Sequence, residues 1–327
     1  MSRSPREVAQ AYAECLIEGD FDRLVALHHP DLICSLLGET IVSGRYVGRD
    51  AFFAHTFKHV LGRLVQSEEQ YLKDARVACA GGDYAVLLLR GGLPTVIGGR
   101  YDQNYMQCFR VIGGHIVENH ELLDTVMLET QIYGKHLAIP RSAPAEPLAP
   151  RRHGSQLEND GAPIEPLAAA FCNALQQANL SAMMAMLAGQ VVLQVAGANP
   201  HSGCTRTRAG VANLAARETA GYRPGTLRWV AGPKLLCFDD QAFCILAEAA
   251  AELTDGRPYR QTIGLLAQCR SGAVNELYLY FDTAAQERQR WRNPLDGNEC
   301  DRAVPPMSID PTPLEDTDPI LQGEILR

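Results

Sequence analysis

The sequence predicts an α+β protein of two tandem units, each with three N-terminal helices packed on a curved antiparallel sheet. Three observations predict this fold class. The chain repeats itself at a nearly constant offset, each half opens with helical periodicity, and each half continues with strand-like segments separated by turn residues. A length of 327 residues suits two domains of roughly 100–200 residues each.

The repeat is visible when the chain is aligned with itself. Residues 12–27 align with residues 171–186 without a gap, at an offset of 159, and after one deleted residue the offset becomes 158. The register then holds to residue 129, which predicts that both halves share one fold. The later matching pairs include Tyr101 with Tyr259, Gln103 with Gln261, Glu118 with Glu276, and Asp124 with Asp282.

Two helices are expected at the start of each half. Apolar residues at i, i+4 spacing over residues 8–17 predict a helix that ends near Gly19. Asp20 can then cap a short second helix by accepting backbone N–H bonds, and Asn179 takes the same place in the second half. His28 is expected at the end of this second helix, where a cation complements the helix dipole.

A third helix and the sheet complete each unit. The third helix follows Gly48 and places apolar residues of the segment 53–64 on one face. Gly113 and Gly114 predict a hairpin turn between the last two strands. The expected strands of the first half span residues 71–80, 84–93, 100–112 and 115–127.

Proline content marks the domain boundaries. Five prolines in or just after residues 135–162 predict a linker, and the acidic, proline-rich end of the chain predicts an extended tail. The expected organisation is a first domain at 1–134, the linker at 135–162, a second domain at 163–293 and the tail at 294–327.

Composition and charge exclude several classes of function. The 30 Lys and Arg against 38 Asp and Glu give a net charge of -8 without a basic stripe, so nucleic acid is not an expected partner. No run approaches the roughly 18 apolar residues of a membrane helix. Charged residues interrupt the first 16 positions, which is unlike a signal peptide, and we expect a cytoplasmic protein without a membrane partner.

The ten cysteines are expected to be free thiols. None are paired as CxxC, and most lie among apolar residues, where a thiol packs as a small hydrophobe. This pattern predicts a reducing compartment, with neither a disulfide framework nor a zinc site.

Several segments carry a family resemblance. They are the helix that ends at Gly19-Asp20, SLLGETIVSGRYVGRDAF and GGHIVENHELLDTVMLETQIYG in the first half, and VAGANPHSG and SGAVNELYLYFDTA in the second. These features resemble the SnoaL-like branch of the nuclear transport factor 2-like superfamily, over residues 6–134 and 163–290. The resemblance implies two tandem cone-shaped α+β barrels, each enclosing an apolar pocket between its helices and its concave sheet.

The resemblance also implies which side chains face the first pocket. Side chains alternate along a strand, so one parity faces inward. By resemblance to ketosteroid isomerase and limonene epoxide hydrolase, the inward residues are Ala85, Leu87 and Leu89, then Asn104, Met106 and Cys108, then Asn119, Glu121 and Leu123. Tyr12 aligns with a helix tyrosine that donates a hydrogen bond in ketosteroid isomerase.

At the matching positions of the second half, the sequence offers no ionisable side chain. We therefore expect catalysis in the first domain alone, with the second as a degenerate copy that completes an intramolecular pseudo-dimer; further homodimerisation stays open. The expected inward residues are Phe171, Phe243, Ile245, Ala247, Thr262, Gly264, Leu266, Leu277, Leu279 and Phe281.

Glu121 is the main acid–base candidate. A carboxyl among apolar residues of neighbouring strands is desolvated, which raises its pKa toward neutrality, where it can both accept and donate a proton. If the strand register slips by one residue, His120 faces inward together with Glu118 and Asp124. His120 is then the natural substitute for Glu121.

The catalytic residues of the two named relatives are mostly missing. The aspartate base of ketosteroid isomerase aligns with Ser35, or with Glu39 under a different gap, and its protonated aspartate aligns with Met106. The Arg-x-Asp pattern of limonene epoxide hydrolase aligns with Ala85 and Leu87, although its other aspartate aligns with Glu121. Each named activity therefore lacks part of its catalytic set in this sequence.

His55 and His59 lie at i, i+4 on the third helix, a spacing that can bind a metal ion on one helix face. No third ligand is evident, so a solvated or pocket-lining pair is the expected arrangement. We expect neither a metal nor another cofactor.

Three functions follow from these residues. The first is a cyclase, isomerase or dehydratase that moves protons on a hydrophobic polyketide- or terpenoid-like molecule, with Glu121 as acid or base and with Tyr12, Asn119 or Asn104 polarising the substrate. The second is an epoxide hydrolase or epoxide-opening cyclase. The third is a non-catalytic binding or scaffold module. The residues expected at the substrate or as catalytic partners are Tyr12, Ser35, Glu39, His55, Leu87, Leu89, Asn104, Met106, Asn119 and His120.

Overall fold

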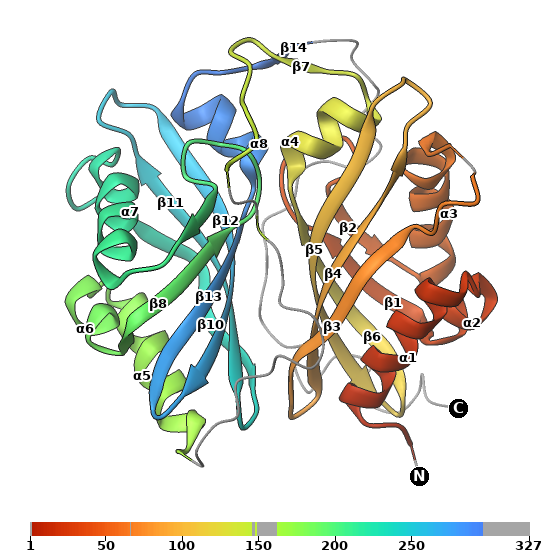
Figure 1. Cartoon of the computed structure of the whole chain (residues 1–327), viewed down its shortest axis with the longest axis horizontal. Coiled ribbons are helices and arrows are strands. Elements are labelled where there is room, and N and C mark those ends of the chain that lie inside the picture. The colour runs from red at the N-terminus through yellow and green to blue at the C-terminus, as the bar shows by residue number, and fades with distance from the viewer. Residues whose placement is uncertain (1, 66, 146–147, 149–161, 297–327) are drawn as a thin grey trace.

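The computed structural model describes residues 2–65, 67–145, 148 and 162–296, and it contains two six-stranded sheets that face each other (Figure 1). The helices of each half lie on the outer side of its own sheet. The first half comprises α1 (Pro5–Glu18), α2 (Phe21–Ala26), β1 (His28–Leu36), β2 (Gly44–Val47), α3 (Arg49–His59), η1 (Leu61–Arg63), β3 (Leu72–Gly81), β4 (Tyr84–Pro94), β5 (Arg100–Ile112), β6 (His115–Leu123), α4 (Thr125–Met127) and η2 (Leu128–Ile132).

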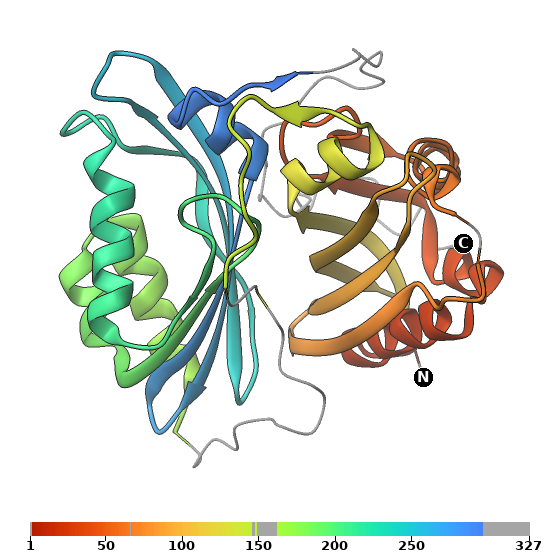
Figure 2. The same cartoon turned by 45° about the horizontal axis from the view of Figure 1, so that its top comes forward.

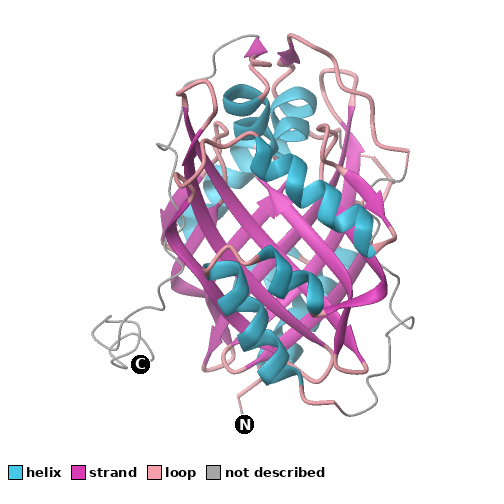
Figure 3. Cartoon of the chain, turned by 90° about the vertical axis from the view of Figure 1, so that its left-hand side faces the viewer, coloured by secondary structure: helices cyan, strands magenta, loops and turns pink. Residues whose placement is uncertain are grey.

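The second half repeats this order of elements. Figure 3 shows its helices lying across the strands, with the strands of the other sheet crossing behind. It comprises α5 (Ile164–Gln176), α6 (Leu180–Ala185), β8 (Leu187–Val195), β9 (Gly203–Thr205), α7 (Arg208–Ala220), β10 (Arg228–Phe238), β11 (Ala242–Glu252), β12 (Pro258–Arg270), β13 (Ala273–Phe281), α8 (Thr283–Ala285) and η3 (Gln286–Arg290).

Both sheets have the same topology. Their strand orders are β2-β1-β6-β5-β4-β3 and β9-β8-β13-β12-β11-β10. All neighbouring strands are antiparallel except the pairs β1 with β6 and β8 with β13, which are parallel. The predicted α+β class of two helix-and-sheet units is therefore confirmed.

Local sequence explains how the first two helices begin and end. Ser4 and Glu7 form a capping box at the start of α1, and Gly19 closes the helix with a φ of 71°. The side chain of Asp20 accepts from the backbone N–H of Arg23 at 3.0 Å and so caps α2. Asn179 caps α6 through Ala182 at 3.0 Å, as the repeat predicts.

Two expectations about these elements are wrong. The segment after α2 forms the strands β1 and β2 before the third helix, so His28 begins a strand and does not cap a helix as a cation. The last strand ends at Leu123 and not at residue 127, because Asp124 accepts from the backbone N–H groups of Val126 and Met127 and starts α4.

The two sheets pack against each other through an apolar layer. The layer is made by the sheet faces that point away from the helices, and strands of both halves contribute to it. Its buried members include Leu88, Met106, Cys108, Leu122, Cys244, Leu246, Leu266, Tyr278 and Tyr280.

Polar contacts at one end of this layer are reciprocal. Thr125 Oγ1 donates to Asp282 Oδ1 at 2.6 Å, and Thr283 Oγ1 donates to Asp124 Oδ1 at 2.6 Å. Asp124 and Thr125 correspond to Asp282 and Thr283 in the repeat, at an offset of 158, so each bond is the counterpart of the other. The halves therefore face each other like the subunits of a twofold dimer.

The expected linker and tail begin with paired segments. β7 (His136–Leu137) pairs with β14 (Leu295–Asp296), and the two lie together across the top of both halves (Figure 2). Residues 146–147 and 149–161 of the linker and 297–327 of the tail lie outside the described residues. In the described part of the chain, no helix is both long and apolar enough to cross a membrane.

His28 provides a testable consequence of this packing. Its ring is 1% exposed between the rings of Tyr12 and Phe53, and burial lowers its pKa to about 4, although its contact with the Leu24 carbonyl opposes this shift. Because the folded pKa lies below that of the unfolded chain, the folded state binds fewer protons between these two values. The neutral ring therefore contributes stability above about pH 6.5 that is lost as the pH falls toward 4.

Replacing His28 by phenylalanine is expected to remove this pH dependence. Urea unfolding should show that the wild type loses about 3 kcal/mol more than His28→Phe between pH 7 and pH 4. The same substitution at the exposed His115 should leave the wild-type pH profile intact. Equal losses in the wild type and His28→Phe would contradict a buried neutral imidazole.

Candidate active site

A cavity of about 650 Å³ lies between the helices and the sheet of the first half. Its wall is mainly apolar, and its volume suits a drug-sized ligand. Polar side chains in its lining come from α1, from the residue before β3, and from β5 and β6; they include Tyr12, Tyr71, Tyr101, Tyr105, Gln107 and Glu121.

Glu121 is the carboxyl group in the interior of this cavity. It lies on β6 and is enclosed by protein, with part of its surface open to the cavity. Burial raises the pKa of the carboxyl to about 7, although the hydrogen bond from Gln107 Nε2 to Oε2, at 3.0 Å, opposes this shift. In the described part of the chain no other side chain hydrogen-bonds to it, so Oε1 remains available to a ligand.

Tyr12 stands beside this carboxyl, as the sequence predicts. Its ring packs on Phe109, with ring centroids 4.8 Å apart, and on His28 at 5.7 Å. Burial raises the pKa of its hydroxyl, and the nearby negative charge of Glu121 raises it further. The phenol therefore remains protonated and can donate a hydrogen bond.

Three further tyrosines, which the sequence analysis missed, surround the same cavity. The hydroxyls of Tyr71 and Tyr105 lie 2.6 Å apart, and burial raises the pKa of both as well as that of Tyr101. When one phenol of the Tyr71–Tyr105 pair donates to the other, the acceptor keeps its own proton for a ligand. The cavity thus places the carboxyl group of Glu121 among four phenols, and its lining also includes Glu18, Glu68 and Glu69.

The expected inward face of β5 is wrong by one residue. Asn104, Met106 and Cys108 belong to the opposite strand face, where Met106 and Cys108 pack in the layer between the sheets. A β-bulge causes this: Val111 pairs with Ile116 but Arg110 pairs with Glu118, which inserts Val117 into β6. Glu121 therefore lies opposite Gln107, and the inward residues of β5 are Tyr105, Gln107 and Phe109.

The structure places the expected residues of β4 on the cavity side, but it places Asn119 behind the cavity wall. Leu87 and Leu89 belong to the core on the cavity side, and Leu89 lines the cavity. Asn119 shares the face of Glu121, but it lies behind the wall, where its Nδ2 donates to Cys34 Sγ at 3.6 Å. Ser35 alternates with cavity-side residues of β1 and faces the other half, so it is not a substrate contact.

Two alternative partners of Glu121 lie elsewhere. His120 faces the second half, with its Nε2 2.9 Å from Glu118 Oε1, so it does not replace Glu121. The carboxylate of Glu39 binds Arg288 Nη2 at 3.1 Å and accepts from Gln289 Nε2 at 2.9 Å, which joins the two halves. Neither side chain lines the cavity.

His55 lies on a face of α3 outside the cavity lining. Its ring packs on Tyr46 at 4.8 Å and on His59 at 4.3 Å. Burial lowers the pKa of His55 to about 4. Among the residues that the structure describes, no group of three His, Cys, Asp or Glu side chains is arranged to hold a metal ion.

The second half encloses a smaller apolar cavity of about 220 Å³. The same bulge recurs, with Cys269 opposite Val274 and Gln268 opposite Glu276, so the inward face of β12 is again shifted by one residue. Thr262, Gly264 and Leu266 are not in the lining, which contains Gln261, Ile263 and Leu265.

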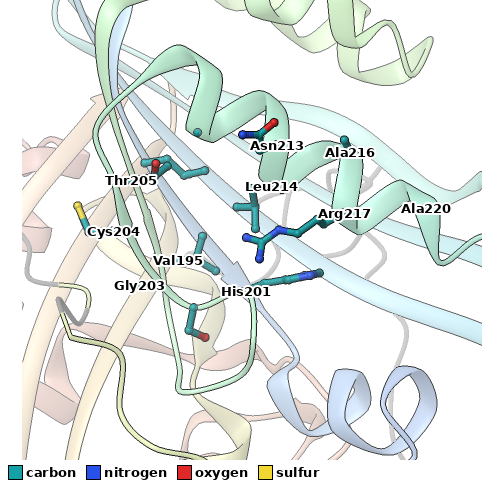
Figure 4. Close-up of a pocket in the computed structure, with 13 residues that line it drawn as sticks. Val195, His201, Gly203, Cys204, Thr205, Asn213, Leu214, Ala216, Arg217 and Ala220 are labelled. Atoms are coloured by element: carbon teal, nitrogen blue, oxygen red, sulfur yellow. The ribbon is translucent and has the colours of Figure 1, made fainter.

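The expectation that no ionisable side chain lines this second cavity is also wrong. His201 from the β8–β9 loop and Glu218 from α7 both line it, with His201 Nδ1 2.6 Å from Glu218 Oε2. His201 also lines a neighbouring open pocket of about 730 Å³ between that loop and α7 (Figure 4). The sequence signal was the HSG of the VAGANPHSG segment, which lies outside the strands used to predict the lining.

One protein-family model matches part of the first half. Residues 9–119 match the family model described as a SnoaL-like domain. A search of curated proteins found no match.

The solved structures that match each cover about two fifths of this chain. An NTF2-like protein from Burkholderia xenovorans LB400 has 16% identity and a TM-score of 0.33, over 38% of this chain and 94% of that chain. TerC, co-crystallised with polyporic acid, has 14% identity and a TM-score of 0.34, over 39% and 97%. A candidate polyketide cyclase from Xanthomonas campestris pv. campestris has 18% identity and a TM-score of 0.33, over 38% and 94%.

Proposed function

We propose that the first half catalyses proton transfer on a hydrophobic polyketide- or terpenoid-like molecule, a proposal supported by the match of residues 9–119 to the SnoaL-like domain model. The reaction class is cyclisation, isomerisation or dehydration. The observation that carries the proposal is a carboxyl group, Glu121, whose pKa is raised to about 7 by burial in a mainly apolar cavity, among the phenols of four tyrosines. A group with this pKa is both a proton acceptor and a proton donor near neutral pH.

The residues around Glu121 support defined roles. Gln107 holds Oε2, which leaves Oε1 to take a proton from a carbon or hydroxyl of the substrate. Tyr12 and the Tyr71–Tyr105 pair remain protonated and can donate hydrogen bonds to the oxygen on which negative charge develops. We propose these phenols as the polarising groups in place of Asn104 and Asn119.

The size and polarity of the cavity support the substrate class. A volume of about 650 Å³ accommodates a fused-ring or terpenoid skeleton, and the apolar wall stabilises it by burial. Epoxide opening requires a second acid or base, and the candidate partners Glu39, His55 and His120 lie outside the lining. We further propose that the second half is a second SnoaL-like copy, which completes the pseudo-dimer.

The bound ligand can be tested directly. Native mass spectrometry of protein purified from its host, or exposed to a lipid-rich extract, is expected to show one stoichiometric hydrophobic molecule. Leu89→Trp fills the cavity and should abolish this adduct, whereas Val47→Trp at an exposed position should retain it. A protein that stays empty against such extracts would favour the non-catalytic scaffold instead.

A further inference from the structure

The second half contains two compartments that meet at His201. The apolar cavity of about 220 Å³ and the open pocket of about 730 Å³ share Leu193, His201 and Leu214 in their linings. A ligand can therefore bury an apolar body in the cavity while its polar group lies at His201.

The imidazole of His201 is arranged as an acid–base group. Its Nδ1 lies 2.6 Å from Glu218 Oε2, and in the described part of the chain no side chain or backbone group hydrogen-bonds to Nε2. A carboxylate at Nδ1 favours the tautomer with the proton on that nitrogen, which leaves the Nε2 lone pair available to a ligand.

Glu218 is suited to orient His201 and not to react itself. Its Oε1 accepts from the hydroxyl of Tyr222, lies 3.3 Å from Arg290 Nη1 and lies 3.5 Å from the hydroxyl of Tyr259. Burial would raise the pKa of Glu218, but the contacts with His201, Arg290 and Tyr222 outweigh it, and its pKa is lowered. The carboxylate stays charged, its Oε1 already accepts hydrogen bonds, and its Oε2 lies at ion-pair distance from His201.

A cation stands on the open side of the imidazole. Arg217 extends from α7 toward His201 in the open pocket (Figure 4), and within the described residues its guanidinium forms no ion pair. The positive charge of Arg217 attracts an oxyanion that forms beside it.

We propose that the second half holds a second acid–base site, at which His201 accepts the hydroxyl proton of a hydrophobic phenol or enol. The O–H bond breaks, its proton moves to His201 Nε2, and the electron pair stays on the oxygen, which faces Arg217. Glu218 then balances the charge of the imidazolium. This site uses no residue of the first cavity.

Both tryptophans of the chain report on this site. Trp229 lines the apolar cavity, and the ring of Trp291 lies 5.3 Å from that of His201. Quenching of tryptophan fluorescence by contact therefore reports a ligand at this site.

The test uses 4-nitrophenol, whose anion absorbs visible light, and 4-nitroanisole, which has the same ring without the O–H. The full-length Glu121→Gln protein removes ionisation at the first cavity. We expect 4-nitrophenol to quench the tryptophan fluorescence saturably. A larger fraction of it should be phenolate when bound than when free in the same buffer. 4-Nitroanisole should bind about tenfold more weakly than 4-nitrophenol. Equal affinities, or no saturable quenching, would overturn the proposal.

Single substitutions test the roles of His201 and Arg217 separately. His201→Gln should lose the phenolate signal and weaken 4-nitrophenol binding about tenfold, and Arg45→Gln, at an exposed position of the first half, should change neither. Arg217→Gln changes an exposed helix position, so it reports even if His201→Gln fails to fold; it should reduce the bound phenolate signal at least twofold. A phenolate signal that both the His201 and Arg217 variants retain would contradict the assignment.

Discussion

Glu121→Gln is expected to slow proton abstraction in the first cavity by a factor of about 10²–10⁴, because the amide cannot accept a proton. The amide keeps the shape of the side chain, so binding of a neutral ligand should change less than fivefold. The substrate is replaced in this test by 2-tetralone, a bicyclic ketone with acidic protons beside its carbonyl. Loss of those proton signals in deuterated buffer, followed by NMR, measures the rate.

Two variants bracket this result. Glu121→Asp keeps the carboxyl group on a side chain that is one methylene shorter, so it should retain part of the exchange rate. Glu14→Gln changes an exposed carboxyl of α1 and should leave the rate at the wild-type value. If Glu121→Gln exchanges as fast as the wild type, Glu121 is not the base.

The same substitution has an opposite effect on stability. Because burial raises the folded pKa of Glu121 to about 7, the folded state binds more protons than the unfolded chain between about pH 4.5 and 7, and stability falls as the pH rises through this range. Glu121→Gln should therefore be up to about 3 kcal/mol more stable than the wild type at pH 8.5. A gain in stability together with a loss of rate identifies a residue retained for chemistry.

Local signals in the sequence were enough for most of the fold. Gly19 and Asp20 end one helix and start the next through contacts within a few residues, and the Gly113-Gly114 turn fixes its hairpin. The strand β1 was missed because its partner β6 lies more than 80 residues away and because His28 resembles a helix-end cation. Its burial among aromatic rings is a tertiary effect that periodicity does not show.

The error in the predicted cavity lining came from one inserted residue. The structure has Glu121 and Tyr12 in the cavity lining, but a single inserted residue, Val117, turns the opposite parity of β5 toward the cavity. Successive side chains of a strand point to opposite faces, so a shift of one residue reverses which of them face the cavity. The bulge therefore turns Gln107, and not Met106, toward the cavity. The polar alternation Tyr101, Gln103, Tyr105 and Gln107 along β5 was the available signal.

The final prediction concerns how the halves share their stability. Leu88 is 1% exposed in the layer between the sheets, where it lies opposite Met106 on the neighbouring strand. Leu88→Ala should cost about 2–5 kcal/mol, through lost burial and the cavity left behind. Both tryptophans belong to the second half, so their fluorescence follows its unfolding. We expect this substitution in the first half to shift the tryptophan transition, coincident with far-ultraviolet circular dichroism.

Leu87 provides the matched control, because it is the preceding residue on the same strand and faces the opposite way, into the core around the ligand cavity. Leu87→Ala should also destabilise the chain, but it should change ligand affinity in the first cavity, which Leu88→Ala leaves intact. Comparing the two variants then separates the effect on ligand binding from the effect on stability, according to the face of β4 on which each residue lies. A tryptophan transition that stays at its wild-type midpoint in Leu88→Ala, while circular dichroism shows an earlier one, would mean that each half unfolds alone. The layer would then hold two independent domains together without making them cooperative.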